Sequence, residues 1–313
     1  MEYTTLGRTG LKVSRMGLGC GGHSRLGLST GSTETEAENV VRAALSLGIN
    51  FIDTAEGYGT EEVVGRGIAQ APRDRIVLST KAGVGWQDRK CTGVEMRHRV
   101  DACLKRLNTD YIDVFHVHGL RVDDYMYACV ELMPTLLDLK LEGKIRFVGV
   151  TEAFGPDPSH LMLTRAVRDA FWDVVMVGFN ILNQSARTEI LARTQEKEIG
   201  TLCMFAVRRV LSHPELLPDL MGDLVSHGQI DGDAFDHENP LGFLIANGIA
   251  DNVQDAAYRF CRWEPGIDIV LSGTGDVAHL KSNVLSLGRP PLPGEIRSRL
   301  RTIFARVDSI SGN

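Results

Sequence analysis

The sequence lacks a long apolar segment and any excess of positive charge. No stretch approaches the roughly 18 consecutive uncharged apolar residues that a membrane span requires, so no membrane partner is expected. Acidic residues outnumber basic residues by 40 to 34, and the formal net charge is -6 at pH 7. Because nucleic acids and anionic membranes bind basic surfaces, this balance also argues against a nucleic-acid partner.

The N-terminus has neither the basic start nor the apolar run that a secretory signal needs. The six cysteines include no Cys-x-x-Cys pair, and most of them lie in apolar stretches. This distribution is typical of reduced core thiols in a cytoplasmic protein and argues against disulfides. His116 and His118 are close in sequence, but no carboxylate or third histidine stands near them at ligand spacing, so no metal site is predicted.

Short apolar, β-branched runs alternate with helical patterns over most of the chain. Several of these runs are apolar on both faces, as parallel strands are when helices cover both sides. The expected strands are Arg15–Cys20, Phe51–Ala55, Ile76–Thr80, Ile112–Val117, Ile145–Val150, Val174–Phe179, Thr201–Phe205 and Ile267–Leu271. Eight strands alternating with helices favour a single-domain (β/α)8 TIM barrel over residues 1–313, although alternation alone is also compatible with a doubly wound open sheet.

Three local features add to this fold prediction. Thr33-x-x-Glu36 and Thr92-x-x-Glu95 are capping-box patterns that predict two helix starts. Tyr3–Val13 contains the turn sequence Gly7-Arg8-Thr9-Gly10 and predicts an N-terminal β-hairpin that could close the bottom of the barrel. Arg208–Asn252, after strand seven, is far longer than a usual connection, so it is either a functional loop or a partly disordered insertion.

Two pattern matches argue for chemistry that the context does not support. Gly17–Gly22 matches the dinucleotide fingerprint G-x-G-x-x-G, but ten residues intervene before the helix start at Thr33, whereas a Rossmann turn enters its helix at once. Gly27–Gly31 matches G-x-S-x-G but follows no strand, which argues against a nucleophile elbow.

Titratable residues stand at the ends of three consecutive expected strands. Asp53, Lys81 and His118 occupy these ends, and Tyr58 follows Asp53 by five residues. In a parallel barrel the carboxyl ends of the strands meet at one mouth, where active sites are built. Each residue alone could be structural, but four such residues at one mouth indicate a site.

The four side chains suit carbonyl reduction by hydride. The developing alkoxide needs a proton donor, and a free phenol, with a pKa near 10, must be tuned for this task. A cationic Lys81 would favour ionisation of Tyr58, and Asp53 would keep Lys81 charged and oriented. His118 could donate a hydrogen bond to the carbonyl oxygen.

These motifs resemble those of the aldo-keto reductase superfamily over nearly the whole chain. The resemblance rests on Asp53–Gly59, Ser79–Lys81, Tyr111–His118, Phe147–Thr151 and Ser272–Thr274. It implies a (β/α)8 barrel, NAD or NADP as cofactor, and a small-molecule carbonyl or alcohol as substrate. It also implies that Asp53, Tyr58, Lys81 and His118 form the catalytic tetrad, with His116 in the barrel interior.

The resemblance further implies cofactor contacts, although several positions depart from the usual residues. Thr151-Glu152 replaces a Ser-Asn pair, and Met176 replaces a glutamine, which leaves Asn180 as the nearest amide. Met204 stands where a tyrosine usually stacks on the nicotinamide, so Phe205 is the expected ring. The full set of expected contacts is Gly21, Thr151, Glu152, Asn180, Phe205, Arg208, Gly273, Thr274, Gly275, His279 and Asn283.

Trp86 and Phe154 are the expected walls of a substrate pocket, although either could instead cover a helix. A short-chain dehydrogenase is a rival interpretation, but its Tyr-x3-Lys pattern occurs at no tyrosine of this chain. A non-catalytic nicotinamide-binding accessory or sensor protein of the same fold is the other alternative. The sequence predicts neither the oligomeric state nor the choice between NAD and NADP.

Overall fold

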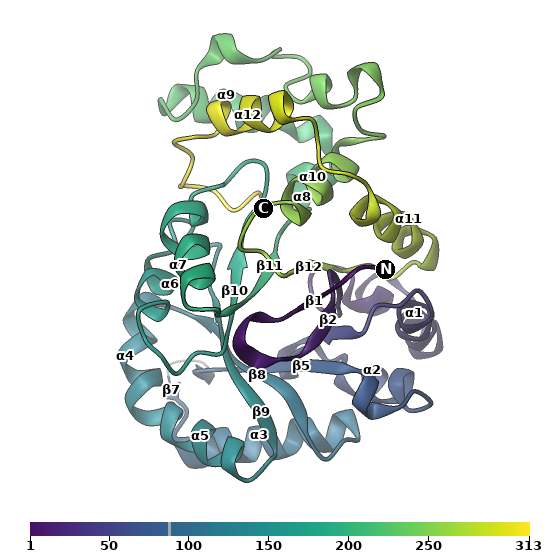
Figure 1. The fold of residues 1–313 in the computed structure, drawn as a ribbon, viewed down its shortest axis with the longest axis vertical. Helices are drawn as coiled ribbons and strands as arrows, with labels where there is room; N and C mark the ends of the chain where they lie inside the picture. Colours follow the sequence, from purple (N-terminus) through teal and green to yellow (C-terminus); the bar gives the residue numbers. More distant parts are fainter. Residues whose placement is uncertain (87–88) are drawn as a thin grey trace.

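In the computed structural model, which describes residues 1–86 and 89–313, eight parallel strands close into a barrel (Figure 1). They are paired in chain order, and the last returns to the first, with Val270 opposite Met16. This closure confirms the predicted barrel and excludes the open sheet. The strands are β3 (Met16–Gly19), β4 (Phe51–Asp53), β5 (Val77–Gly83), β8 (Ile112–Leu120), β9 (Ile145–Glu152), β10 (Val174–Gly178), β11 (Gly200–Met204) and β12 (Ile269–Ser272).

The barrel interior is a packed apolar core at its N-terminal end. Because side chains alternate along each strand, one face of every strand points inward. Inward residues from the strands form one cluster, which includes Phe51, Val77, Val114 and Leu202. Leu6 of the N-terminal hairpin joins this cluster and is fully buried. The hairpin therefore closes the bottom of the barrel.

The hairpin itself agrees with the sequence prediction. Strands β1 (Tyr3–Thr5) and β2 (Lys12–Ser14) pair antiparallel, with Tyr3 opposite Ser14. In Figure 1 this hairpin crosses the end of the barrel as a purple ribbon.

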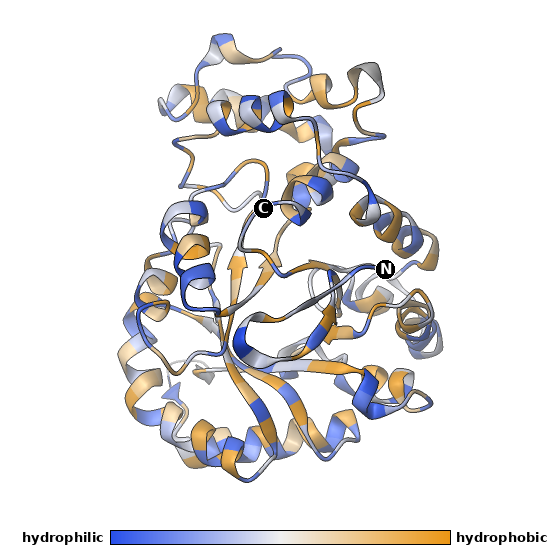
Figure 2. Cartoon of the chain, in the orientation of Figure 1, coloured by the Kyte–Doolittle hydropathy of each residue, from blue (hydrophilic) through white to orange (hydrophobic). Residues whose placement is uncertain are grey.

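Helices cover the outside of the barrel, and both predicted capping boxes are present. Glu36 N donates to Thr33 Oγ1 at 3.3 Å, and Thr92 N donates to Glu95 Oε2 at 2.8 Å. Figure 2 shows many hydrophobic residues along the barrel strands, and a mixture of hydrophobic and hydrophilic residues along the helices. No helix in the described ranges has the length and apolar character needed to cross a bilayer. The main covering helices are α1 (Glu34–Ser46), α2 (Glu61–Ile68), α3 (Gly93–Leu107), α5 (Met133–Leu141), α6 (Leu161–Ala166), α7 (Ala192–Glu196), α10 (Val253–Arg262) and α11 (Val277–Gly288).

The long stretch after strand seven is folded, not a disordered insertion. It contains α8 (Arg209–Ser212), α9 (Leu217–Ser226) and several single helical turns before α10 begins. At the top of Figure 1, α9 lies with the yellow α12 (Gly294–Ile303). Arg299 of α12 contacts the long stretch after β11 at two points. Its Nη2 donates to Ala234 O at 3.2 Å, and its guanidinium lies over the Phe243 ring.

The last residues of the chain return to the C-terminal end of the barrel strands. Asn183 Nδ2 donates to Ile310 O at 2.8 Å, and Val210 N donates to Gly312 O at 3.3 Å. The C-terminus therefore lies above β10 and β11, as the label in Figure 1 shows.

Candidate active site

The structure brings the four residues of the expected tetrad together at the C-terminal end of the barrel. Asp53 is the last residue of β4, and Lys81 and His118 point inward from β5 and β8. Tyr58 reaches the same mouth from the short turn η3 (Glu56–Tyr58). The phenol oxygen of Tyr58 lies 3.3 Å from Nε2 of His118, and Nζ of Lys81 lies 5.2 Å from the centre of the Tyr58 ring.

Four strands, β5, β8, β9 and β12, end later than the sequence predicts, and the first two correct the position of Lys81 and His118. Strand β5 ends at Gly83, not at Thr80, and β8 ends at Leu120, not at Val117. Parallel pairing continues past the apolar runs, with Gly83 still opposite His118. Lys81 and His118 therefore lie within strands rather than after them, and the backbone of the sheet sets their direction.

A buried ion pair lies behind the phenol. Lys81 is 1% exposed and Asp53 3% exposed, and Lys81 Nζ donates to Asp53 Oδ2 at 2.6 Å and to Thr54 O at 2.8 Å. Ser79, which precedes Lys81 on the same face of β5, donates its hydroxyl to Asp53 Oδ1 at 2.7 Å. Burial alone would lower the pKa of Lys81, but the Asp53 carboxylate, together with Tyr58 and Cys20, outweighs burial and the pKa is raised. Lys81 is therefore charged in this site.

The phenol of Tyr58 is held on several sides. A Cβ added to Gly21 would lie 2.3 Å from the Tyr58 ring, so the backbone of the loop after β3 packs directly against it. Burial raises the pKa of Tyr58, and the nearby Lys81 ammonium offsets this only in part. The sequence predicted the effect of Lys81 but not the larger effect of burial. Tyr58 is therefore protonated at neutral pH, as a proton donor must be.

His118 is a neutral imidazole beside that phenol. Its ring meets the Tyr58 ring edge-on, with centroids 5.5 Å apart. Burial, together with the charges of Lys81 and Arg99, lowers the pKa of His118 to about 3. The imidazole can therefore accept or donate a hydrogen bond at the mouth without carrying charge.

Three loops meet beside the tetrad, on the side where the sequence places the nucleotide. A Cβ added to Gly275 would lie 2.4 Å from the backbone of Gly27, and one added to Gly273 would lie 2.9 Å from Gly19 O. The loops after β3 and β12 are thus in backbone contact, which only glycine permits. A Cβ at Gly22 would lie 3.6 Å from Nη1 of Arg208, so the segment after β11 reaches the same place.

Arg208 lies across this junction. Its Nε donates to Asn313 Oδ1 at 2.5 Å, and its guanidinium lies 4.1 Å from the centre of the Phe205 ring. Phe205 itself has a φ of 65°, a left-handed conformation that a bulky residue adopts only when its surroundings impose it. Arg209, the other cation that follows β11, is exposed on α8.

The three residues expected to bind the carboxamide are already hydrogen bonded within the protein. Thr151 Oγ1 accepts from Gly119 N at 2.7 Å, and Glu152 accepts from Gly178 N at 2.7 Å. Asn180 is fully buried, and its amide makes four hydrogen bonds, to Phe205 O, Ser311 O, Leu182 N and Asn183 N. Asn180 therefore has no hydrogen-bonding position left for a ligand, and it holds the C-terminal residues in place.

Glu152 forms a buried pair with a residue that the sequence analysis did not single out. Both oxygens of its carboxylate lie 2.9 Å from Nδ1 of His160. Burial raises the pKa of Glu152, and His160 opposes this change. The Phe154 ring stacks on His160 with centroids 5.2 Å apart. Phe154 is only 2% exposed, so it supports Phe205 from behind instead of facing an open pocket.

The remaining expected cofactor contacts lie in α11 and in the loop before it, and the expected pocket wall Trp86 follows β5. Asp276 Oδ1 accepts from Ala278 N at 2.6 Å and from His279 N at 2.8 Å, so this carboxylate caps the helix. Asn283 Nδ2 donates to Ser272 Oγ at 2.9 Å, and Thr274 Oγ1 accepts from Asp276 N at 3.1 Å. Trp86 is in the short strand β6 (Gly85–Trp86), but its side chain lies outside the described part of the molecule.

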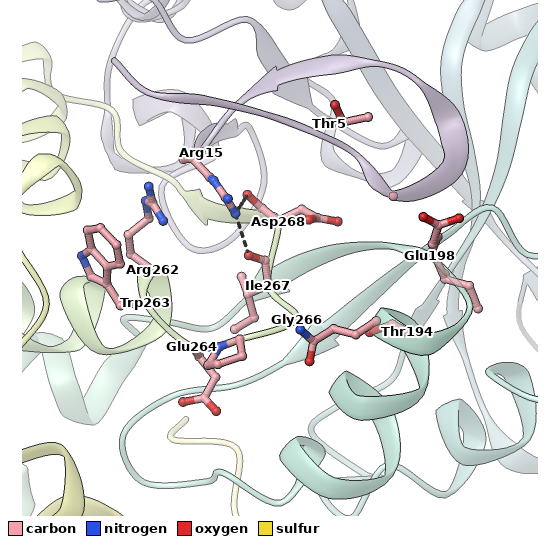
Figure 3. Close-up of a pocket in the computed structure, with 14 residues that line it drawn as sticks. Thr5, Arg15, Thr194, Glu198, Arg262, Trp263, Glu264, Gly266, Ile267 and Asp268 are labelled. Carbon is pink, nitrogen blue, oxygen red and sulfur yellow. Dashed lines mark hydrogen bonds between the residues drawn. The ribbon is translucent and has the colours of Figure 1, made fainter. Parts of the chain in front are cut away.

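A polar cavity of about 450 Å³ lies at the other end of the barrel (Figure 3). Its lining includes Arg15, Arg262 and Asp268, which flank the N-terminal ends of the strands. Arg15 donates to Ile267 O at 3.1 Å and to Asp268 O at 3.4 Å, as the dashed lines in Figure 3 show. This cavity is separate from the candidate tetrad.

Comparisons with known proteins agree with the barrel. The L-galactose dehydrogenase of Arabidopsis thaliana is 38% identical over 157 residues, which make up 48% of this chain and 48% of that protein, so the match spans about half of that relative. The aldo-keto reductase YhdN of Bacillus subtilis is 29% identical over 308 residues, covering 90% and 87% of the two chains. The holo form of aldo-keto reductase AKR11C1 from Bacillus halodurans aligns with a TM-score of 0.72 over 96% and 95% of the chains, at 24% identity, and shows the fold alone.

A family model described as the aldo/keto reductase family matches residues 15–301. This match covers most of the chain, including every strand of the closed barrel. The chain therefore belongs to the aldo/keto reductase family of oxidoreductases.

Proposed function

We propose that this protein transfers a hydride between NAD or NADP and an aldehyde, ketone or sugar, with Tyr58 as the general acid and base. The observation that carries the proposal is the 3.3 Å approach of the Tyr58 phenol to His118, with the buried Lys81–Asp53 pair behind the ring. A phenol between a neutral imidazole and a fixed cation suits reversible proton transfer to an alkoxide.

The four side chains divide the work of carbonyl reduction. When bound, the nicotinamide would supply the hydride. Tyr58 donates its proton to the carbonyl oxygen as negative charge develops there, and Lys81 stabilises the resulting phenolate. Asp53 keeps Lys81 charged and aimed at the ring, and His118 fixes the angle of the carbonyl by a hydrogen bond. In alcohol oxidation the same phenolate takes the proton back.

The residues at the loop junction suit a dinucleotide. The close contacts of Gly273 and Gly275 with the loop after β3 keep side chains out of this junction, and Arg208 supplies a cation for the pyrophosphate. Gly21 packs against Tyr58, Phe205 lies under Arg208, and Thr151 accepts from Gly119 N next to His118, so these three residues would hold the nicotinamide end. Glu152 would act with Thr151, because a carboxylate accepts hydrogen bonds from a carboxamide NH2.

The adenosine end of the cofactor is proposed to lie against Thr274, His279 and Asn283. The capping of α11 by Asp276 bears on the choice of cofactor. Its carboxylate already occupies the backbone amides that an anion would use at this helix start. We therefore propose that NAD is used at least comparably to NADP, within about tenfold in kcat/KM.

The alternative function is a nicotinamide-binding accessory or sensor protein without catalysis. Such a protein would need the loop junction but would not need a charged lysine buried beside a phenol. The burial of both Lys81 and Asp53 favours the enzyme. Removing an ion pair from water costs desolvation free energy, and a protein without catalysis would gain nothing from that cost.

The test is the Tyr58→Phe variant, assayed with NADH and NADPH against a panel of aldehydes, ketones and sugars. We expect wild-type turnover and a loss of at least about a hundredfold in the variant, the usual scale of general acid catalysis. Cofactor binding, measured by fluorescence titration, should stay within about twofold, because the phenyl ring still packs against Gly21. Binding without turnover in the wild type would support the accessory function. Near-normal turnover in the variant would remove Tyr58 from its role.

A further inference from the structure

The turn that carries Tyr58 is closed at its base by a buried hydrogen bond between the hydroxyls of Thr54 and Thr60, 2.8 Å apart, but little within the turn fixes its tip. It is the three-residue η3, in which Tyr58 N donates to Ala55 O at 3.1 Å. Gly57 is exposed, and Gly59 has the left-handed φ of 70° that ends the turn. Glycine allows the backbone more freedom than other residues do. The position of the phenol therefore depends on contacts that reach the turn from other elements.

Arg99 of helix α3 makes such a contact. Its Nε donates to Glu56 Oε2 at 3.0 Å, its Nη2 pairs with the other oxygen of Glu56, and its Nη1 donates to Gly83 O at 2.6 Å. The side chains of Arg99 and Glu56 are each 22% exposed. One guanidinium thus joins the turn before Tyr58, the end of β5 and helix α3. This fork of donors is specific to arginine, since a lysine ammonium is a point charge.

Helix α3, which carries Arg99, is held firmly against the barrel. The helix begins at its capping box, and Met96, Val100 and Cys103 are fully buried in the core around the barrel. Buried side chains on both sides of Arg99 in sequence fix the rotation of the helix about its axis. The direction in which Arg99 leaves the helix is therefore set by the core and not by the mouth.

Arg99 also contributes charge next to His118. The charged and titratable groups around this imidazole are Lys81 from β5, Arg99 from α3, the Tyr58 hydroxyl from η3 and the neutral His116 on its own strand. Lys81 and Arg99 both disfavour a proton on His118. Removing Arg99 would take away one cation and leave the Glu56 carboxylate unpaired, and both changes favour the imidazolium.

We propose that Arg99 is a positioning residue for proton transfer: through Glu56 it holds the turn that places the Tyr58 phenol beside His118. Its charge has the second effect of keeping the imidazole neutral. Arg99 does not touch the reacting atoms, so its action is indirect. This inference rests on the proposed function, because it gives Arg99 a task in the reaction of Tyr58.

The test uses Arg99→Met, Arg99→Lys and Glu56→Gln. Arg99→Met and Glu56→Gln should each lower kcat by about ten- to a hundredfold, since a misplacement of about 1 Å can have an effect of that order. KM and the cofactor Kd should change much less, because neither side chain lies at the loop junction. Arg99→Lys, which keeps the charge but not the fork, should lie between wild type and Arg99→Met and serves if the methionine variant fails to fold.

The matched control is Arg97→Met on the same helix. Arg97 pairs with Glu142, and its Nη1 lies 2.7 Å from both carboxylate oxygens, away from the turn. This control should leave kcat unchanged. A drop in Arg97→Met equal to that in Arg99→Met would show a general weakening of α3 and would overturn the positioning role.

An NMR titration of His118 gives a readout that does not depend on turnover. The pKa of His118 should rise in Arg99→Met, stay low in Glu56→Gln and stay unchanged in Arg97→Met, with His118→Gln used to assign the signal. Normal kcat in Arg99→Met and Glu56→Gln, with an active wild type, would overturn this inference and leave the proposed function standing. A wild type without turnover on any carbonyl would overturn the proposed function and the positioning role together, whereas the titration would still report on the charge of Arg99.

Discussion

The imidazole of His116 lies so close to Gly149 on the neighbouring strand that a Cβ there would be 2.2 Å from Nδ1 of the ring. The ring is fully buried, and neither of its nitrogens has a hydrogen-bond partner among the described residues. Burial, together with the charge of Lys81 and the neighbouring His118, lowers the pKa of His116 well below its ordinary value. A neutral imidazole thus lies directly below the candidate tetrad, as the sequence predicted for a barrel-interior residue.

This burial predicts a pH-dependent stability. Because the pKa of His116 is lower in the folded than in the unfolded state, the unfolded state takes up the proton first as the pH falls below about 6.5. His116 therefore decreases the free energy of unfolding by up to about 1.4 kcal/mol for each further pH unit. In His116→Leu this loss should be smaller between about pH 6.5 and 5, as measured by urea unfolding.

The control for His116 is His98→Leu, an exposed histidine on α3. It should leave the pH dependence of unfolding unchanged. An equal pH dependence in His116→Leu and wild type would mean that His116 has a partner that the structure lacks.

Lys81 and Asp53 should behave as one unit. Lys81→Met leaves a buried carboxylate without its cation, and Asp53→Asn leaves a buried ammonium without its anion, so each should abolish measurable reduction. Either change should also destabilise the fold by about 3–5 kcal/mol, the usual effect of breaking a buried pair. The double variant should be less destabilised than the sum of the singles, because no charge is left unpaired. Additive losses of stability in thermal unfolding would show that the two residues act separately.

Arg208 should contribute to cofactor binding, and Arg209 should not. Arg208→Met is expected to raise the Kd of the reduced cofactor by about tenfold or more, roughly 1.4 kcal/mol, by removing the pyrophosphate cation. Arg209→Met, one residue further and exposed, is the matched control. Asn313→Ala should tighten binding slightly, because it releases the Nε of Arg208 from its present acceptor. Equal effects of Arg208→Met and Arg209→Met on the Kd would contradict this assignment.

Cofactor choice should respond to the cap of α11. The carboxylate of Asp276 accepts hydrogen bonds from the backbone amides of His279 and Ala278. These hydrogen bonds lower the pKa of Asp276 and keep the carboxylate charged. This charge opposes a 2'-phosphate, so wild-type kcat/KM for NADPH should exceed that for NADH by no more than about tenfold, roughly 1.4 kcal/mol. His279→Arg should shift the ratio towards NADPH, because a guanidinium can pair with the phosphate. A strong wild-type preference for NADPH would mean that another cation, such as Lys281, supplies this pairing.

The positions of the tetrad could be predicted because each depends on local pattern. Asp53, Lys81 and His118 follow apolar runs that predict parallel strands, and alternation along a strand tells which residues share a face. Ser79 was missed, although its place two residues before Lys81 on the same face of β5 was a usable signal. The environment of these residues was harder to predict. The pKa of Tyr58, for example, depends on how deeply the folded chain buries the phenol.

Contacts between distant segments carried no such signal. Arg99 and Glu56 are 43 residues apart. In the sequence, Arg99 stands on the polar face of a helix and cannot be told from any other surface arginine. Asn180 was expected to contact the cofactor, but it holds Ser311, which is 131 residues away. Its role depends on where the end of the chain lies, and no local pattern predicts that.

The strands along the chain, their alternation with helices and the side chains that face the mouth could be predicted from the sequence, because hydrophobic periodicity and residue spacing are local properties. The packing of the folded chain was needed to show where β5 and β8 end, which loops touch at Gly273 and Gly275, and which arginine pairs with Glu56 in the turn that carries Tyr58. All three depend on how the whole barrel packs, since a strand ends where its neighbours stop pairing with it and a side chain binds the groups that folding brings near.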